Sequence, residues 1–293
     1  MTIFTLSAKG NIMKAYALFN PMAANSCGEE KALLLKESIN DLIFVDMTQI
    51  ESYTDFFNGV ALDDRIIICG GDGTLNNFIN QTDGIDIKND IYYYATGSGN
   101  DFLRDLELDG SEPICITEHL KNLPYVIVNG IKRRFLNGVG FGIDGYCCEV
   151  GDEQRRRNPK EKIDYTKIAI KGLLGAFKPA NATVYVDGEE HHFKNVWIAP
   201  TMVGRFYGGG IMPAPAQSRY DREDHLSVSV FHCKSKLKAL IIFPSLFKGT
   251  HVKRKKVSAI MQGKHIRVVF DSPRALQIDG ETVLNVTEYE AFI

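Results

Sequence analysis

The stretch Arg65-Ile66-Ile67-Ile68-Cys69-Gly70-Gly71-Asp72-Gly73-Thr74-Leu75-Asn76 decides the fold. Its first five residues form an uninterrupted apolar, β-branched run, which is typical of a strand buried on both faces of a parallel sheet. The glycines that follow allow a sharp turn, and residues 75–80 predict a helix. A strand, a glycine-rich turn and a helix in this order indicate an α/β unit, in which the N–H groups of the helix N-terminus can bind phosphate.

The same alternation of strand and helix extends on both sides of this stretch. Continuous apolar strands separated by helices predict an α/β domain with a parallel sheet covered on both faces, over residues 1–124. The expected strands are 15–19, 42–45, 65–69 and 91–95, and the expected helices are 29–39, 51–58, 75–80 and 102–106.

The pattern changes after residue 124, where short strands are linked by Asn-Gly and Asp-Gly turns. This part predicts an antiparallel, β-rich sandwich domain over residues 125–293. The expected strands are 125–128, 133–137, 183–186, 196–199, 226–232, 265–270 and 276–278. Helices are expected at 165–177 and 236–247.

Composition narrows the classes of function. The net charge of −2 gives the chain no overall attraction to nucleic acid, so no nucleic-acid partner is predicted. The six cysteines show neither CxxC pairs nor metal-ligand spacing, which favours reduced thiols in a cytoplasmic protein. No apolar run approaches the roughly 18 residues that span a bilayer. The first residues lack a signal-peptide core, and Met13 is compatible with a second start.

A second glycine loop, Gly97-Ser98-Gly99-Asn100-Asp101, also follows a strand and precedes a helix. The carboxyl ends of parallel strands meet at one edge of the sheet, so both loops are expected there, with Asp72 and Asp101 around one nucleotide-metal site. A carboxylate repels bare phosphate, which implies that Asp72 acts through Mg²⁺ or water. The other interpretation of Gly70-Gly71 is a tight turn with an Asp cap. Neither loop matches the Walker or dinucleotide-binding patterns.

Six landmarks occur in the order typical of one family. They are Asn20-Pro21, GGDGTLN at 70–76, GSGNDFLR at 97–104, FLNGVGFG at 135–142, GGG at 208–210 and QIDGE at 277–281. Together they resemble the diacylglycerol kinase catalytic family, which includes bacterial lipid kinases and sphingosine kinases. The resemblance implies a nucleotide domain and a sandwich domain with the site between them, and transfer of the γ-phosphate of ATP to a lipid hydroxyl.

The resemblance also implies roles for individual residues. Asp72 and Asp101 would hold Mg²⁺, directly or through water, and Glu281 would be the catalytic base. Residues expected to bind ATP are Asn20, Gly70, Gly71, Gly73, Thr74, Asn76, Gly97, Ser98 and Asn100. On its motif alone, Glu281 also fits a plain hairpin turn, because Asp187-Gly188-Glu189 repeats the same letters.

Two departures from the family pattern keep alternatives open. Asn77 stands where the family usually has Glu, and the acid-rich segment 220–226 has His225 where Gly is common. The alternatives are an NAD kinase-like enzyme and a nucleotide-binding protein without catalysis.

Two basic runs, 155–162 and 248–256, are either solvated or contact anionic lipid head groups. The expected partner is a lipid substrate at a membrane surface, with transient membrane association. A homodimer is compatible with the sequence.

Overall fold

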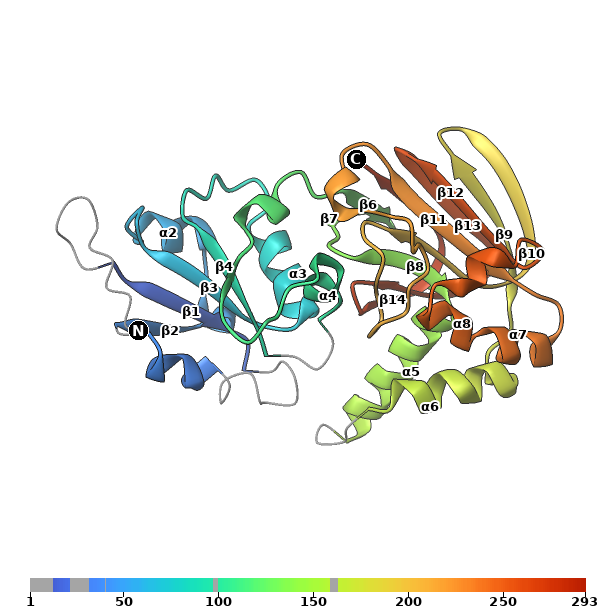
Figure 1. Cartoon of the computed structure of the whole chain (residues 1–293), viewed down its shortest axis with the longest axis horizontal. Helices are drawn as coiled ribbons and strands as arrows, with labels where there is room; N and C mark the ends of the chain where they lie inside the picture. Colours follow the sequence, from blue (N-terminus) through green and yellow to red (C-terminus); the bar gives the residue numbers. More distant parts are fainter. Residues whose placement is uncertain (1–12, 22–31, 40, 97–99, 159–162) are drawn as a thin grey trace. The chain divides into compact units, whose positions relative to one another are not determined.

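The computed structural model describes residues 13–21, 32–39, 41–96, 100–158 and 163–293 (Figure 1). The chain divides into two compact units. The first comprises Met1–Leu103 and Leu108–Lys121, and the second comprises Arg104–Glu107 and Asn122–Ile293. None of the helices in the described ranges is both long and apolar enough to span a bilayer.

The first unit is built on a five-stranded sheet in the order β2-β1-β3-β4-β5. Its strands are β1 (Ala15–Phe19), β2 (Leu42–Asp46), β3 (Arg65–Gly70), β4 (Ile91–Ala95) and β5 (Ile114–Cys115). The first four strands pair in parallel, as predicted, and β5 adds a short antiparallel edge. Alternation of buried apolar strands with helices therefore correctly predicted the α/β architecture.

The helices of this unit are α2 (Tyr53–Asn58), α3 (Asp72–Gln81) and the start of α4 (Asp101–Leu106), whose residues 104–106 belong to the second unit. Short 3₁₀ turns are η2 (Leu35–Glu37), η3 (Met47–Gln49) and η4 (Thr117–Leu120). The expected helix at 29–39 lies partly outside the described residues, and its described part ends in η2. Helix α3 begins three residues earlier than predicted, because Gly71 is its extended N-cap. Asp72, Gly73 and Thr74 therefore form its first turn.

Buried side chains of β3 form the core beneath this turn. Ile66, Ile67 and Ile68 are almost completely inaccessible. Cys69 is also buried, and burial raises the pKa of its thiol to about 12, so it acts as a small apolar side chain. The cysteines of the described residues are free thiols, as expected, and Cys27 lies outside those residues.

The second unit contains a nine-stranded sheet in the order β12-β11-β10-β8-β13-β14-β6-β7, with β9 paired to both β10 and β13. Its strands are β6 (Tyr125–Val128), β7 (Ile131–Arg134), β8 (Gly138–Gly142), β9 (Ala180–Val186), β10 (Glu189–Met202), β11 (Leu226–His232), β12 (Ser258–Gly263), β13 (His265–Ile278) and β14 (Glu281–Phe292).

Two long strands give this sheet its sandwich-like form. The first parts of β10 and β13 both pair with β9, and their last parts both pair with β8. Shifts of register interrupt each long strand, so each can bend and contribute to both layers. The apolar core between the layers includes Phe141, Val184 and Phe270. The predicted β-rich sandwich domain is therefore confirmed.

Some expected boundaries in this unit were wrong. The expected strand 133–137 matches only the last two residues of β7, because β7 ends at Arg134 and the chain turns before β8. Strand β8 was missed because glycine has a low β-propensity, although its glycines face closely packed neighbours. A Cβ at Gly140 would lie 2.5 Å from the Cα of Pro200 on β10. The expected strands 265–270 and 276–278 belong to the single strand β13.

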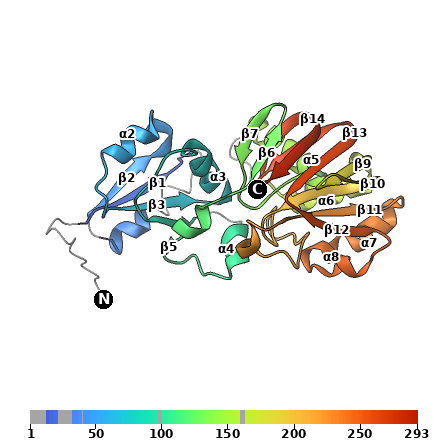
Figure 2. The same ribbon diagram turned by 90° about the horizontal axis from the view of Figure 1, so that it is seen from above.

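Helical segments cover one side of this sheet (Figures 1 and 2). They are α5 (Ile143–Arg157), α6 (Tyr165–Lys171), the π-helical turn η5 (Gly172–Ala176), α7 (Lys236–Ile242) and α8 (Pro244–Phe247), with the 3₁₀ turns η6 (Arg219–Asp221) and η7 (Thr250–Lys253) elsewhere. The inner faces of α5, α6, η5, α7 and α8 pack with Trp197 in a second apolar core. The expected helix 165–177 is thus α6 continued by η5, and the expected helix 236–247 is divided at Pro244.

A buried ionic network lies within the second unit. Asp105 accepts hydrogen bonds from Arg219 Nε at 2.9 Å and from Arg205 Nε at 3.0 Å. The other guanidinium nitrogens of Arg219 donate to the Leu136 carbonyl and to the Asn137 side chain. Only 1–2% of the Asp105 and Arg219 side chains is exposed, so each charge depends on the other for its stabilisation.

The variant Asp105→Asn is expected to lower the free energy of unfolding by about 3–5 kcal/mol, because it leaves the buried Arg219 charge without its counter-ion. Chemical denaturation would measure this change. The matched control is Glu107→Gln, which removes an exposed ion pair to Arg205 and should change the free energy by less than about 1 kcal/mol. Equal effects of both variants would contradict this account.

Candidate active site

Asp72 connects the two predicted loops of the first unit. Its carboxylate accepts the backbone N–H of Asp101 at 2.7 Å and that of Phe102 at 3.4 Å, and thereby caps the N-terminus of α4. Two segments 29 residues apart thus meet at the carboxyl edge of the sheet, as predicted. Asp72 is therefore a helix cap, although it caps α4 rather than its own helix, and the shared nucleotide-metal site stays a prediction.

Asn100, which precedes α4, is held by a residue of β4. Tyr93 donates its hydroxyl to Asn100 Oδ1 at 3.3 Å. Burial, together with the nearby Asp72 and Cys69, raises the pKa of Tyr93 well above its ordinary value, so the hydroxyl keeps its proton. Gly97 and Ser98 lie outside the described residues, and their expected role in binding ATP stays a prediction.

The three glycines of the first loop differ in whether the surrounding structure requires a glycine. A Cβ at Gly70 would lie 2.4 Å from Thr74 Cβ, so this glycine lets α3 pack closely against β3. A Cβ at Gly73 would meet no protein atom within 4 Å. Packing therefore does not require glycine at this position in the first turn of α3, where glycine weakens a helix. Gly71 has φ −102°, so it is not a left-handed position, and any effect of a larger side chain there must be steric.

The other predicted ATP-binding residues are placed without direct evidence for that role. Asn76 is fully buried and accepts two hydrogen bonds from Asn80 Nδ2. Thr74 is buried against Gly70, and Asn20 follows the end of β1 at the same edge of the sheet as Gly70. Asn76 and Thr74 thus support the loop, while Asn20 lies at the edge where ligands bind in such sheets.

The donor set at this edge suits Mg²⁺. The Asp72 carboxylate accepts the backbone N–H of Asp101, and hard oxygen ligands such as carboxylates are those that Mg²⁺ prefers. Within the described ranges, no group of three or more His, Cys, Asp and Glu side chains forms a metal site. Two carboxylates fit the usual case, in which substrate phosphates and waters complete the coordination of Mg²⁺.

In the second unit, Asp279 holds the turn that carries Glu281. Its carboxylate accepts the backbone N–H groups of Leu136, Asn137 and Gly138 at 2.5, 2.7 and 2.9 Å. Asp279 and Gly280 both have positive φ, as in the hairpin turns that match strand twist. The backbone at the start of β14 is thereby fixed to the start of β8.

Buried polar side chains lie next to the same turn, and one of them, Gln277, bonds to it directly. Gln277 Oε1 accepts the Gly280 N–H at 2.8 Å, and Asp144 Oδ2 accepts the Tyr207 hydroxyl at 3.1 Å. Gln277 Nε2 and Asp144 Oδ1 are buried, and neither has a hydrogen-bond partner within standard geometry among the described residues. Burial raises the pKa of Asp144 to about 7, despite opposing hydrogen bonds from Gly145 and Tyr207.

The triple glycine at 208–210 explains the position of Tyr207. All three glycines have positive φ, which side chains rarely allow. They form a tight loop closed by two backbone hydrogen bonds between Tyr207 and Ile211, each 3.0 Å long. The sequence motifs include this glycine run but predict no role for Tyr207 or Asp144. The glycine run was the only local signal that could have drawn attention to Tyr207.

The two Asp-Gly-Glu turns differ in the surroundings of their glutamates. Glu281 forms an ion pair with Arg133 at 2.5 Å, and 38% of its side chain is exposed. Glu189 is 79% exposed and lies near His191. Asp187 accepts N–H groups from Lys264 and His265, as Asp279 does in the other turn. The turns therefore share a backbone function, and only Glu281 is held in a defined position.

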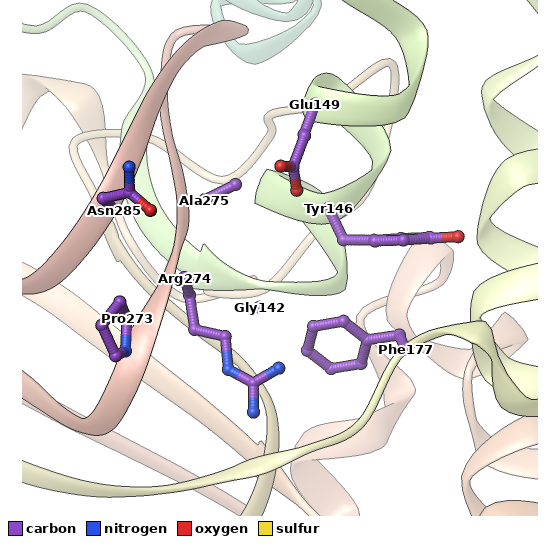
Figure 3. Close-up of a pocket in the computed structure, with 8 residues that line it drawn as sticks. All are labelled: Gly142, Tyr146, Glu149, Phe177, Pro273, Arg274, Ala275 and Asn285. Atoms are coloured by element: carbon purple, nitrogen blue, oxygen red, sulfur yellow. The ribbon is translucent and has the colours of Figure 1, made fainter. Parts of the chain in front are cut away.

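A cavity of about 190 Å³ lies beside the first turn of α5 (Figure 3). The Arg274 guanidinium lies 5.4 Å from the ring centre of Phe177, and that ring lies 5.8 Å from the Tyr146 ring. Gly142, Glu149, Pro273, Ala275 and Asn285 complete the wall. No predicted site residue lines this cavity, so it has no assigned part in the reaction.

Two family models match the chain. Residues 14–125 match the diacylglycerol kinase catalytic domain, and residues 137–289 match the YegS C-terminal NAD kinase beta sandwich-like domain. The chain belongs to the diacylglycerol and lipid kinase family. The family assignment from the sequence motifs is therefore confirmed.

Individual relatives agree with the family. A diacylglycerol kinase of Mycobacterium tuberculosis (strain H37Rv) is 28% identical over 203 residues, which cover 67% of this chain and 63% of that protein. The alignment thus spans less than two thirds of the relative's length. A crystal structure of a diacylglycerol kinase from Bacillus anthracis is 19% identical and matches with a TM-score of 0.58, covering 96% of this chain and 94% of that chain. This likeness shows the fold.

The raised pKa of Asp144 predicts that the stability of the second unit depends on pH. The pKa of this carboxyl is higher in the folded chain than the ordinary 3.8, so the folded state binds the proton more tightly, and stability falls as pH rises from about 4 towards about 7. Between pH 5 and pH 8 the expected loss is about 2–3 kcal/mol, from about 1.36 kcal/mol per pKa unit.

Asp144→Asn keeps the shape and stays neutral, so this part of the pH dependence should disappear in the variant. Denaturant unfolding of both proteins at pH 5, 6, 7 and 8 would measure the difference. Parallel pH profiles for the two proteins would show that Asp144 is not the titrating group.

Proposed function

We propose that this lipid kinase transfers the γ-phosphate of ATP to the hydroxyl of diacylglycerol or a related membrane lipid. The observation that carries the proposal is the hydrogen bond between the Asp72 carboxylate and the backbone of Asp101, which joins the start of α4 to the N-terminal turn of α3. Helix N–H groups and a carboxylate pair suit a magnesium–polyphosphate ligand. The names of the family and of the relatives support a lipid as the acceptor.

The residues have separate parts in the reaction. N–H groups at the start of α3 bind phosphate oxygens, and the absence of a Cβ at Gly73 lets the phosphate approach the backbone. Asp72 and Asp101 would hold Mg²⁺, which would offset the negative charge on the phosphates. Tyr93, which stays protonated, keeps Asn100 in place through its hydroxyl.

Glu281 is the proposed base. Its carboxylate takes the proton of the lipid hydroxyl while that oxygen forms a bond to the γ-phosphorus, and the bond from that phosphorus to ADP breaks. Arg133 orients Glu281 through the ion pair, and Asp279 fixes the backbone of the turn. The proposal therefore assigns orientation to Arg133 and Asp279, and proton transfer to Glu281 alone.

A direct assay separates this proposal from the remaining alternative. Purified protein with Mg²⁺ and γ-labelled ATP is offered vesicles that contain diacylglycerol, ceramide or sphingosine, and in parallel NAD. Label in a lipid product supports the proposal and identifies the acceptor. Binding of ATP with no labelled product from any acceptor would favour a nucleotide-binding protein without catalysis, an alternative motivated by Asn77 in place of the family's Glu.

Glu281→Gln is expected to lower kcat by about 10²–10⁴-fold, because it keeps the shape and removes the proton acceptor. The affinity for ATP should change little. Steady-state kinetics and calorimetric titration with ATP measure the two quantities. The matched control is Glu189→Gln in the other Asp-Gly-Glu turn, where no change is expected. If both variants lose activity equally, Glu281 is not the base.

Asp72→Asn is expected to reduce turnover at least 100-fold, since the neutral amide is a weaker ligand for Mg²⁺ than the carboxylate. The amide oxygen can still accept the N–H of Asp101, so the fold should remain. Turnover as a function of Mg²⁺ concentration, together with circular dichroism, tests both expectations. Activity equal to that of the wild type would exclude Asp72 from the mechanism.

A further inference from the structure

Two pairs of exposed apolar side chains lie on neighbouring helical segments of the second unit. Leu237 and Ile241 are four residues apart on α7, with 68% and 66% of each residue exposed. Ile170 on α6 and Leu174 on η5 are also four residues apart, with 47% and 65% exposed. Residues four apart lie on the same face of a helix. Segments α7 and η5 contact each other, and Lys236 Nζ lies 3.8 Å from the Cβ position of Gly175.

Folding does not account for these apolar residues. The same segments bury other side chains, Ile168, Leu173 and Ile242, in the core around Trp197. Each segment is therefore apolar on its buried side and again on its outer side. Apolar residues that gather on an outer face mark an interaction surface.

The charges on the segments that carry these exposed residues are mostly positive. Segments 163–178 and 234–248 contain a single acidic residue, Asp164, whose carboxylate accepts the Lys167 N–H at the start of α6. They also contain seven exposed lysines, which are Lys167, Lys171, Lys178, Lys234, Lys236, Lys238 and Lys248. Apolar side chains framed by lysines are typical of helices that lie in the interface of an anionic membrane.

We propose that this surface, formed by the outer faces of α6, η5 and α7, docks on a bilayer that contains anionic phospholipids. Leu174, Leu237 and Ile241 enter the boundary between head groups and acyl chains. The lysine stems lie along the apolar region while their ammonium groups remain with the lipid phosphates. The proposal deepens the proposed function, because it assigns the face through which the kinase reaches a lipid substrate.

The charges also discriminate between occupants. A second copy of the chain would place the same lysines against one another, and like charges disfavour such a contact. A nucleic acid would attract the lysines but would leave the exposed Leu and Ile side chains without an apolar partner. An anionic bilayer satisfies the apolar residues and the lysines together.

Co-sedimentation with vesicles tests the proposal without ATP and without substrate. The vesicles are phosphatidylcholine alone, or phosphatidylcholine with about 30% phosphatidylglycerol. The wild type should partition at least tenfold more strongly onto the anionic vesicles, and added salt should weaken this binding. Equal binding to both kinds of vesicle, or binding to neither, would overturn the proposal.

Variants then locate the surface. Leu237→Ser combined with Ile241→Ser should reduce partitioning at least tenfold, and Lys236→Gln or Lys238→Gln should each reduce it about fivefold, from the typical effect of one basic residue near a charged membrane. The matched control is Leu62→Ser, which replaces an exposed leucine of the first unit and should bind like the wild type. Partitioning that the surface variants leave unchanged would overturn the assignment.

Two further measurements test whether misfolding or self-association, rather than lost membrane contact, reduces the partitioning of the variants. Circular dichroism and thermal unfolding should be the same for all variants, because the replaced side chains are exposed. Sedimentation velocity would detect self-association, and its loss in the Leu237 and Ile241 variant would assign the surface to a second copy and overturn the proposal.

Phosphorylation of a short-chain diacylglycerol in detergent micelles should be unaffected in the surface variants. Vesicle binding without kinase activity would contradict the proposed function alone. Kinase activity with unaltered vesicle binding in the variants would contradict the docking surface alone.

Discussion

The second unit depends on the acceptance of three backbone N–H groups by the carboxylate of Asp279. These groups belong to Leu136, Asn137 and Gly138, at the point where the chain enters β8. A carboxylate that receives several N–H groups is strongly held, because charge-assisted hydrogen bonds are about twice as strong as neutral ones. This interaction fixes the β13–β14 turn to the start of β8, and therefore fixes the backbone that precedes Glu281.

The first unit uses the same physical device. Asp72 accepts N–H groups from the start of α4 and so joins two loops that lie far apart in sequence. In both units, an aspartate in a glycine-containing turn accepts hydrogen bonds from backbone N–H groups of a different segment. The glycines provide the conformations, and the carboxylate provides the contact over a long sequence separation. One short motif can therefore leave room for a ligand through its glycines and hold a neighbouring segment in place through its aspartate.

Local sequence patterns were sufficient to predict the four parallel strands of the first unit. Apolar runs such as 65–69 have few alternatives to a buried parallel strand, and the turns after them are marked by glycine. In the second unit, β8 was missed because the glycines that let it pack against β10 also remove its strand signal. The alternation in β14 is weak, because several of its outer residues are charged and exposed. The division of the chain at residue 124 stays a prediction.

The candidate site could be predicted only where a motif is continuous in sequence. Asp72, Asp101 and Glu281 each lie in a short, recognisable loop. Their partners do not: Arg133 reaches Glu281 across 148 residues, and Arg219 reaches Asp105 across 114. Ion pairs of this kind arise from the topology of the folded unit, and no local pattern announces them. Asp144 was missed for the same reason, since its burial depends on Tyr207 and Gln277.

The pairing of the second unit also has a consequence for the order of folding. Strand β6, at the beginning of the unit, pairs with the final strand β14, and β8 pairs with the end of β13. Contacts between such distant segments form slowly, because a long loop must close before they are made. During synthesis on the ribosome, the first unit can fold as soon as it emerges. The second unit cannot complete its sheet until β14 has been synthesised, and intermediates with unpaired strand edges are prone to aggregation.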